Sequence, residues 1–397
     1  MSRPKIASIV NTYGPYDHGQ HLTDRFLHGY AWDNKHHHPP FDLVALYVDQ
    51  FNDDDVSRRR AKQYPSMKIY PSIKEAICCG GEKLAVEGIM VISEHGAYPV
   101  TEKGLTQWPR YEFFQQIVEV FKDSGRTAPI FNDKHLSWNW EWAVDMVETS
   151  RTMGFGFMAG SSLPVLRRVP SIELPLNADV EEVLGIGPGG PDSYAIHILE
   201  GMQGMVERRH GGENGVVSLQ AIRGDDVWDT IQAGSWDAGG CDPSLLEACL
   251  CRAMHLNQPK DGFNHMYPKP SDFPNLVNHE PIAYHYEHAD GLKATMLQVE
   301  GLCDFTLACR LKDRPDPLAT MVYIAPRDGP CIFSPLAHHI ETLFLTGVSP
   351  YPIERTLLTT GISNAGMESL WLGCTKIETP HLDVNYRSTQ GSTFRHT

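Results

Sequence analysis

Ala128-Pro-Ile-Phe-Asn-Asp133-Lys134-His135-Leu-Ser-Trp138 is the stretch that decides the fold. Its first half has the apolar character of a buried strand, and an acid, an amine and an imidazole follow before a helix begins. In an open sheet of parallel strands, ligands bind in the crevice beyond the carboxyl ends of the strands. Asp133, Lys134 and His135 are therefore candidates for chemistry. The alternative is that they only cap the next helix.

Strand and helix patterns alternate on both sides of this stretch. Their spacing indicates helices with apolar stripes at 20–30, 111–122 and 140–153. Short apolar runs between them indicate strands at 5–10, 41–48, 67–70, 88–92 and 156–159. Such alternation predicts a doubly wound parallel, Rossmann-like sheet in residues 1–163.

The pattern changes after Pro164. Longer strands at 216–222, 283–288, 294–300, 306–311 and 319–324 predict a mostly antiparallel sheet with one face in water. The fold class is therefore α/β, with a Rossmann-like domain and a second α/β domain at 164–379 for substrate binding or oligomerisation. Helices between 337 and 372 can pack back on the first domain, a loop is expected at 258–281, and 380–397 form an extended tail.

Composition narrows the class of partner. The 397 residues are 41% hydrophobic and 21% charged, which is typical of a soluble globular protein. A net charge of −15 argues against nucleic acid or an anionic membrane as partner, since both need a cationic surface. No apolar run is long enough to span a bilayer, no signal peptide is recognisable, and the nine cysteines form no C-x-x-C pair. We expect a cytoplasmic protein with reduced thiols that binds a small molecule.

The order of several motifs resembles the Gfo/Idh/MocA-like oxidoreductases, the family of glucose–fructose oxidoreductase and inositol dehydrogenase. Asp133-Lys134-His135 stands where that family ends a strand in Glu-Lys-Pro, and Gly160-Ser-Ser162 stands at the following strand turn. Gly189-Gly-Pro-Asp192-Ser-Tyr-Ala-Ile-His197 resembles its Gly-Gly…Asp-x-x-x-His helix. The segments 339–347, 354–360 and 365–369 resemble its closing helices.

The resemblance implies an NAD- or NADP-dependent oxidoreductase acting on a hydroxyl or carbonyl of a small polar, sugar-like substrate. Lys134 matches the active-site lysine and His197 the histidine that carries the proton, while Asp133 stands for the family's glutamate. Asp192 lies five residues before His197 instead of four, so the two share a helix face less well. The resemblance also implies a homodimer or higher oligomer formed through the open face of the second sheet.

The segment where the family binds its nucleotide departs most from the family's sequence pattern. A dinucleotide site needs glycines directly after the first strand, but Asn11-Thr-Tyr-Gly14-Pro-Tyr-Asp17-His18-Gly19 lacks the G-x-G-x-x-G spacing. Asp49 ends the second strand, where a ribose-binding acid would lie. The residues expected to bind the cofactor are Asn11, Gly14, Asp49, Glu94 and His95.

Two other functions compete with the oxidoreductase. The residues expected at this crevice include many imidazoles and carboxylates. His197 and Glu200 are three residues apart, so they share one face of a helix. A divalent metal ion held by His95, His135, His197 and Glu200 would suit a nucleotide-independent lyase, isomerase or hydrolase. The third possibility is a scaffold subunit without catalytic activity.

Overall fold

The computed structural model describes residues 3–254, 280–300, 304–324 and 330–396. The loop expected at 258–281 lies almost entirely outside the described residues. The chain divides into two compact units. The first comprises 1–99, 106–162 and 325–357, and the second comprises 100–105, 163–324 and 358–397.

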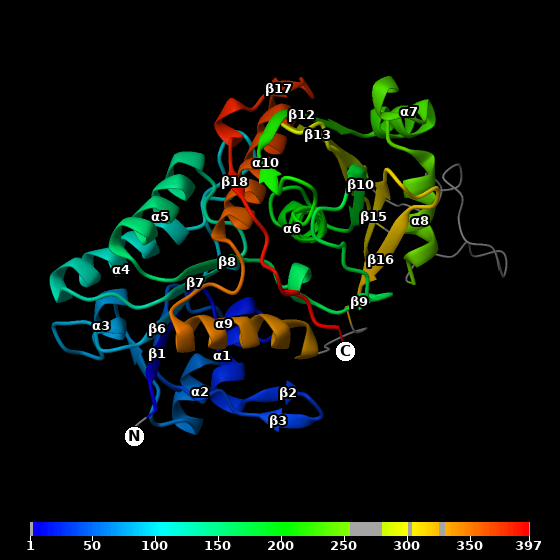
Figure 1. Ribbon diagram of the computed structural model, residues 1–397. Coiled ribbons are helices and arrows are strands. Elements are labelled where there is room, and N and C mark those ends of the chain that lie inside the picture. The colour runs from blue at the N-terminus through cyan, green and yellow to red at the C-terminus, as the bar shows by residue number, and fades with distance from the viewer. Residues whose placement is uncertain (1–2, 255–279, 301–303, 325–329, 397) are drawn as a thin grey trace. The chain divides into compact units, whose positions relative to one another are not determined.

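The first unit is built on a six-stranded sheet in which every neighbouring pair is parallel, in the order β5-β4-β1-β6-β7-β8. β6 reads Gly-Ile-Met-Val-Ile and is buried throughout, as expected for a strand covered on both faces. Helices α3, α4 and α5 cover one face, and α1 and α2 the other (Figure 1). The strands are β1 (Lys5–Val10), β4 (Asp42–Val48), β5 (Lys68–Tyr70), β6 (Gly88–Ile92), β7 (Ile130–Asp133) and β8 (Phe157–Gly160), and the helices are α1 (His18–His28), α2 (Ser57–Gln63), α3 (Ile73–Ile77), α4 (Arg110–Ser124) and α5 (Trp140–Met153).

Two further elements complete this unit. A hairpin of β2 (Tyr30–Trp32) and β3 (Lys35–His37) follows α1 at a place where the sequence patterns give no strand. Helix α9 (Ser334–Thr346) packs directly on the sheet, because a Cβ on Gly88 would lie 2.7 Å from the ring of Phe344. The 3₁₀ turn Pro330–Phe333 precedes α9.

The second unit has an eight-stranded mixed sheet of order β17-β12-β13-β14-β10-β15-β16-β9, antiparallel except between β10 and β14. The predicted fold class, a parallel Rossmann-like sheet followed by a mostly antiparallel one, is confirmed. The strands are β9 (Arg168–Val169), β10 (Val180–Gly187), β12 (Val216–Arg223), β13 (Ile282–His288), β14 (Lys293–Gln298), β15 (Phe305–Leu311), β16 (Leu318–Val322) and β17 (Ile377–Glu378); β11 (Glu213–Asn214) pairs with β18 (Asn385–Tyr386), and the helices are α6 (Ala195–Val206), α7 (Asp225–Ala233), α8 (Pro243–Arg252) and α10 (Ile353–Trp371), which runs from the first unit into the second.

Helices cover both faces of this mixed sheet. Along β10, a Cβ on Gly185 would lie 2.6 Å from Met202 of α6, whereas Leu184 and Ile186 join a core cluster with α7 and α8. Alternate residues of a strand point to opposite faces, so α6 lies on one face and α7 with α8 on the other. The expectation of one wet face is therefore wrong here, because α7 and α8 bury it. Dimerisation through an open sheet face is not supported by this arrangement.

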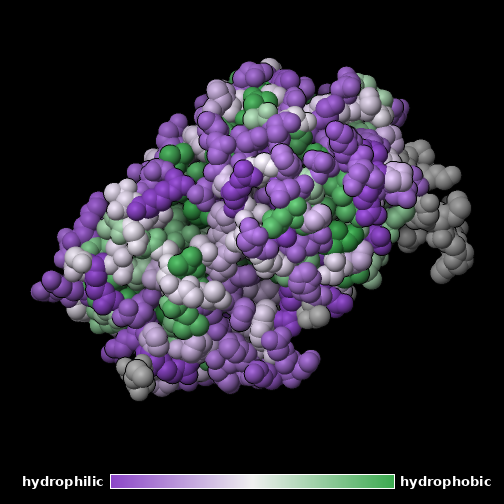
Figure 2. All heavy atoms as spheres, viewed as in Figure 1, coloured by the Kyte–Doolittle hydropathy of each residue, from purple (hydrophilic) through white to green (hydrophobic). Residues whose placement is uncertain are grey.

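The face of the molecule that Figure 2 shows is mainly polar. Figure 2 shows hydrophilic residues over most of the visible face, with hydrophobic residues in small separate groups. Among the described helices, none is both long and apolar enough to cross a membrane.

Candidate functional site

The strand order of the first unit reverses between β1 and β6, and such a switch point opens a ligand crevice at the carboxyl ends of the strands. Asn11 and Ser93 directly follow these two strands and are fully buried. Ser93 Oγ donates a hydrogen bond of 2.8 Å to Asn11 Oδ1. Asn11 Nδ2 has no hydrogen-bond partner in the described part of the chain. The crevice therefore presents a buried amide donor to a ligand.

Lys134 follows β7 in a backbone conformation that lysine seldom adopts. Its φ of 61° lies in the left-handed region, which costs about 1–3 kcal/mol and is concentrated at functional sites. The Lys134 amide donates to the carbonyl oxygen of Gly160 at 3.1 Å, which fixes the turn. The side chain is buried and its ammonium pairs with Glu94, which lies two residues after β6. The lysine predicted from the motif thus lies at the crevice with a carboxylate partner.

Arg110, at the start of α4, connects Glu94 to His135. Arg110 is fully buried, and its Nη2 donates to Glu94 Oε2 at 3.0 Å. Its Nη1 lies 2.9 Å from His135 Nε2, which must accept because a guanidinium only donates. Burial, followed by the charges of Arg110 and Lys134, holds the pKa of His135 well below its ordinary value. His135 is therefore a neutral, orienting residue.

Asp133 is buried at the end of β7, and its Oδ2 lies 2.7 Å from Nδ1 of His18, the first residue of α1. Burial alone would raise the pKa of Asp133, but the charge and hydrogen bond of His18 outweigh it, together with the charges of Lys134 and Arg110. The pKa of Asp133 consequently lies below its ordinary value, and the group is a carboxylate at neutral pH. Its Oδ1 has no hydrogen-bond partner among the described residues, so it can accept from a ligand.

We expect Asp133→Asn to destabilise the protein at neutral pH and to have little effect in acid. A carboxyl whose pKa is lowered by folding stabilises the native state above its unfolded pKa of about 3.9. That contribution is lost as the pH falls through the folded pKa. Urea unfolding from neutral pH downward measures it, with Asp123→Asn, exposed on α4, as the control. A difference in the free energy of unfolding that stays constant across this range would contradict the expectation.

His95 lies at the rim of the same crevice. Its ring centroid is 5.6 Å from that of His18, and its Nδ1 is 3.9 Å from Asp17 Oδ1. Burial and then the charge of His18 lower the pKa of His95, so that it is neutral at physiological pH.

The turn after β1 forms an anion site that one of its own carboxylates fills. Asp17 Oδ2 accepts hydrogen bonds from the amide of Gly14 at 2.8 Å and from Thr12 Oγ1 at 2.6 Å. Asp17 is also the N-cap of α1, where the helix dipole favours negative charge. Phosphate groups of ligands bind at such helix N-termini. The Asp17 side chain accepts no hydrogen bond from the helix amides, but it occupies the Gly14 amide and the Thr12 hydroxyl, so a ligand anion could use these two donors only after the carboxylate turns away.

Gly19 has the packing role that dinucleotide folds give to a glycine. A Cβ there would lie 2.4 Å from the carbonyl oxygen of Thr12 and 3.2 Å from Val10 Cβ, so α1 approaches β1 closely only because residue 19 has no side chain. At Gly14, by contrast, the nearest atoms to a Cβ would be side-chain carboxylate oxygens of Asp17 and Asp54, each at 3.0 Å.

Gly19→Ala is therefore expected to lower the free energy of unfolding by about 1–3 kcal/mol, the usual cost of overpacking against backbone. Gly14→Ala, in the same turn, meets movable side chains and should cost less than about 1 kcal/mol. Chemical denaturation of both variants measures the difference. Equal losses would show that the close contact of α1 with β1 does not depend on Gly19.

Asp49, the residue predicted to bind a ribose, directly follows β4. Its two oxygens accept hydrogen bonds of 2.7 Å from the hydroxyls of Tyr47 and Tyr98. Burial, followed by the hydrogen bond to Asp49, raises the pKa of each tyrosine, so both remain donors. The half-buried carboxylate keeps lone pairs that can accept from a ribose hydroxyl.

The other predicted site residues belong to the second unit. Helix α6 begins at Ala195, so Asp192 lies in the preceding turn and not on the helix that carries His197. The sequence prediction that compares their helix faces is wrong for this reason. His197 is mostly buried, with ring centroids of Tyr194 and Phe305 at 5.4 and 6.1 Å. Glu200 is buried one turn further along α6.

The predicted metal set, His95, His135, His197 and Glu200, is not supported. Within the described residues, no three His, Cys, Asp or Glu side chains are grouped to hold a metal ion. In addition, His135 Nε2 is used by Arg110, and the charges of Arg110 and Lys134 would repel a divalent cation.

Sequence reasoning missed three members of this site: His18, Arg110 and Tyr98. His18 directly precedes Gly19, and Arg110 follows Pro109 at the start of an amphipathic helix. His18 and Arg110 are each the first residue of a helix, and a helix start is the signal that could have identified them.

No protein-family model and no curated protein matches the sequence. Solved structures do match it. The myo-inositol dehydrogenase from Lactobacillus casei, in complex with NAD(H) and myo-inositol, has a TM-score of 0.55 at 11% identity, covering 98% of this chain and 99% of that one. The myo-inositol dehydrogenase from Corynebacterium glutamicum has a TM-score of 0.53 at 12% identity, with 95% and 99% covered. GenD2 from gentamicin A biosynthesis, in complex with NAD, has a TM-score of 0.55 at 11% identity, with 95% and 97% covered.

The chain therefore has the fold of these dehydrogenases along nearly its whole length. The resemblance inferred from the order of the motifs is confirmed at the level of the fold. At this identity the likeness shows the fold alone.

Proposed function

We propose that this chain is an oxidoreductase that exchanges hydride between NAD or NADP and a hydroxyl or carbonyl group of a small polar, sugar-like substrate. The observation that carries the proposal is Lys134, a buried ammonium held in a left-handed turn at the switch point and oriented by Glu94. A dehydrogenase of the same fold is known in complex with NAD(H) and myo-inositol, which supports this choice.

The donors of the crevice fit a dinucleotide. The Gly14 amide and Thr12 hydroxyl already bind an anion, the carboxylate of Asp17, and Asn11 Nδ2 is a buried donor at the same strand ends. Asp49 would accept from a ribose. Asp17 is partly exposed, so its carboxylate can rotate away from the amide. When bound, the nicotinamide would supply the hydride acceptor or donor.

The residues of the chain supply the proton chemistry. Lys134 donates a hydrogen bond to the substrate oxygen and stabilises the negative charge that develops there during oxidation of an alcohol. Glu94 and Arg110 hold the ammonium in place. The resemblance to the Gfo/Idh/MocA-like family supports His197 as the base that would take the hydroxyl proton.

The test is an assay of the full chain with NAD⁺ and NADP⁺ against myo-inositol, scyllo-inositol and simple aldoses, following the absorbance of the reduced nicotinamide. We expect turnover with at least one polyol. Turnover that does not need a nucleotide would instead favour the acid–base alternative, a lyase, isomerase or hydrolase.

A further inference from the structure

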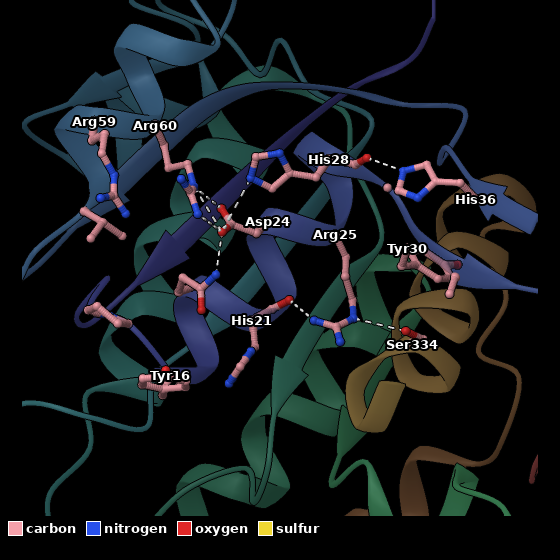
Figure 3. Close-up of a pocket in the computed structure, with 15 residues that line it drawn as sticks. Tyr16, His21, Asp24, Arg25, His28, Tyr30, His36, Arg59, Arg60 and Ser334 are labelled. Carbon is pink, nitrogen blue, oxygen red and sulfur yellow. Dashed lines mark hydrogen bonds and ion pairs between the residues drawn. The ribbon is translucent and has the colours of Figure 1, made fainter. Parts of the chain in front are cut away.

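A second candidate site lies outside the Lys134 crevice. A cavity of about 580 Å³ opens on the outer side of α1, between α2, the β2–β3 hairpin and the start of α9 (Figure 3). This volume lies within the range of about 300–1,000 Å³ that is typical of small-molecule sites. All the lining residues belong to the first unit, and none of Glu94, Arg110, Asp133 and Lys134 is among them.

The cavity is positively charged in a protein whose net charge is −15. Arg25, Arg59 and Arg60 line it, against the single acid Asp24. Arg60 donates three hydrogen bonds to that acid, from Nε to Oδ1 at 2.9 Å and to Oδ2 at 3.0 Å, and from Nη2 to Oδ2 at 2.7 Å. Figure 3 shows Arg60 and Asp24 facing each other, with Arg59 beside them. With Asp24 engaged by Arg60, the lining keeps an excess of guanidinium charge.

Arg25 is held in position within the cavity wall. It is 6% exposed, its Nε lies 3.4 Å from Ser334 Oγ, and its guanidinium stacks 5.6 Å from the Phe333 ring. His21, one helical turn earlier, stacks on the same ring at 5.0 Å. Burial, and then the charges of Arg25 and His18, lower the pKa of His21 to about 4. A fixed guanidinium beside a neutral imidazole is suited to binding an oxyanion.

Rings line the rest of the cavity. Tyr30 is anchored through its hydroxyl to Glu341, and His36 Nε2 lies 2.7 Å from the carbonyl oxygen of His28. Tyr16 is 66% exposed and belongs to the same lining. Aromatic side chains offer the faces on which a sugar ring can rest, while polar edges bind its hydroxyls.

We propose that this cavity binds a small sugar phosphate, with Arg25 and Arg59 on the phosphate and the aromatic rings against the sugar. Guanidinium groups match phosphate geometry with paired N–H donors, which favours a phosphate over an uncharged sugar. The site goes beyond the proposed redox function and does not depend on it.

Calorimetry on the full chain tests the site with ribose 5-phosphate, inorganic phosphate and ribose as probes. Ribose 5-phosphate should bind more tightly than phosphate, and ribose should not bind. Arg59→Gln should weaken ribose 5-phosphate about tenfold or more, the effect of losing a charge-assisted hydrogen bond. The matched control is Arg58→Gln, because Arg58 is exposed, stacks on Phe51 at 4.2 Å and does not line the cavity. The Arg58→Gln variant should bind ribose 5-phosphate as tightly as the wild type does. The pKa of His21, followed by NMR, should rise on binding.

Three outcomes would overturn the proposal: no binding of ribose 5-phosphate, equal losses in Arg58→Gln and Arg59→Gln, or ribose binding as tightly as its phosphate. A fourth concerns NADP. If Arg59→Gln weakens NADPH but neither NADH nor ribose 5-phosphate, the cavity reads the phosphate of the cofactor and is not a separate site.

Discussion

Lys134→Met is expected to lower kcat/KM about 10²–10⁴-fold while leaving nucleotide affinity unchanged. The ammonium is the one charged donor that the β7 turn places at the switch point, and positioned proton-transfer and hydrogen-bonding groups contribute effects of this size. Methionine keeps most of the volume and removes the charge. Glu94 keeps its bond to Arg110, so the carboxylate is not left unpaired. Steady-state kinetics with the most active polyol measure the loss.

The control is Lys122→Met, which removes an exposed lysine of α4 and should change neither activity nor melting temperature. A Lys134→Met enzyme that folds normally and keeps its kcat/KM would place the chemistry elsewhere. An activity loss that merely follows a loss of melting temperature would assign Lys134 a structural role.

Asp17→Asn is expected to tighten NAD(H) or NADP(H) binding about 10–100-fold. The Asp17 carboxylate accepts from the Gly14 amide and the Thr12 hydroxyl, two donors that a diphosphate would need, and its negative charge would repel the diphosphate. Two unit charges about 4 Å apart near a protein surface interact by about 4 kcal/mol, so removing part of this repulsion is enough for the gain. Asparagine is neutral and can still accept from Gly14 and Thr12. Calorimetric titration of both proteins measures the change.

Asp53→Asn is the matched control, because Asp53 is exposed and contributes the same formal charge to the first unit. Its effect on nucleotide affinity should be small and should vanish with added salt. If Asp17→Asn weakens binding, the carboxylate is part of the nucleotide site. If it changes nothing, the phosphate does not bind at the turn after β1.

The crevice could be predicted because its residues follow apolar strands. The apolar side chains of Ile130, Phe131 and β6 predict that both strands are buried. Because neighbouring strands are parallel, the residues that follow each strand meet at the same edge of the sheet. Lys134, Asp133 and Glu94 were therefore identified by position. Their partners were not, since the contact between His18 and Asp133 spans 115 residues and has no local pattern.

Other features depend on tertiary packing. The strands β2 and β3 of the hairpin have three residues each, which is too short for an alternating pattern to mark them. The burial of the second sheet's expected wet face depends on where α7 and α8 pack. The contact of the Asp17 carboxylate with the Gly14 amide depends on side-chain geometry, which glycine spacing does not predict. The missing G-x-G-x-x-G motif therefore could not by itself decide whether the chain binds a nucleotide.

The central claim, that this chain binds a nicotinamide nucleotide, is tested most directly by titrating the wild-type chain with NAD⁺, NADH, NADP⁺ and NADPH. We predict saturable binding of at least one of the four, with displacement of the Asp17 carboxylate from the Gly14 amide in the complex. Absence of binding by all four, in both the wild type and Asp17→Asn, would contradict the account.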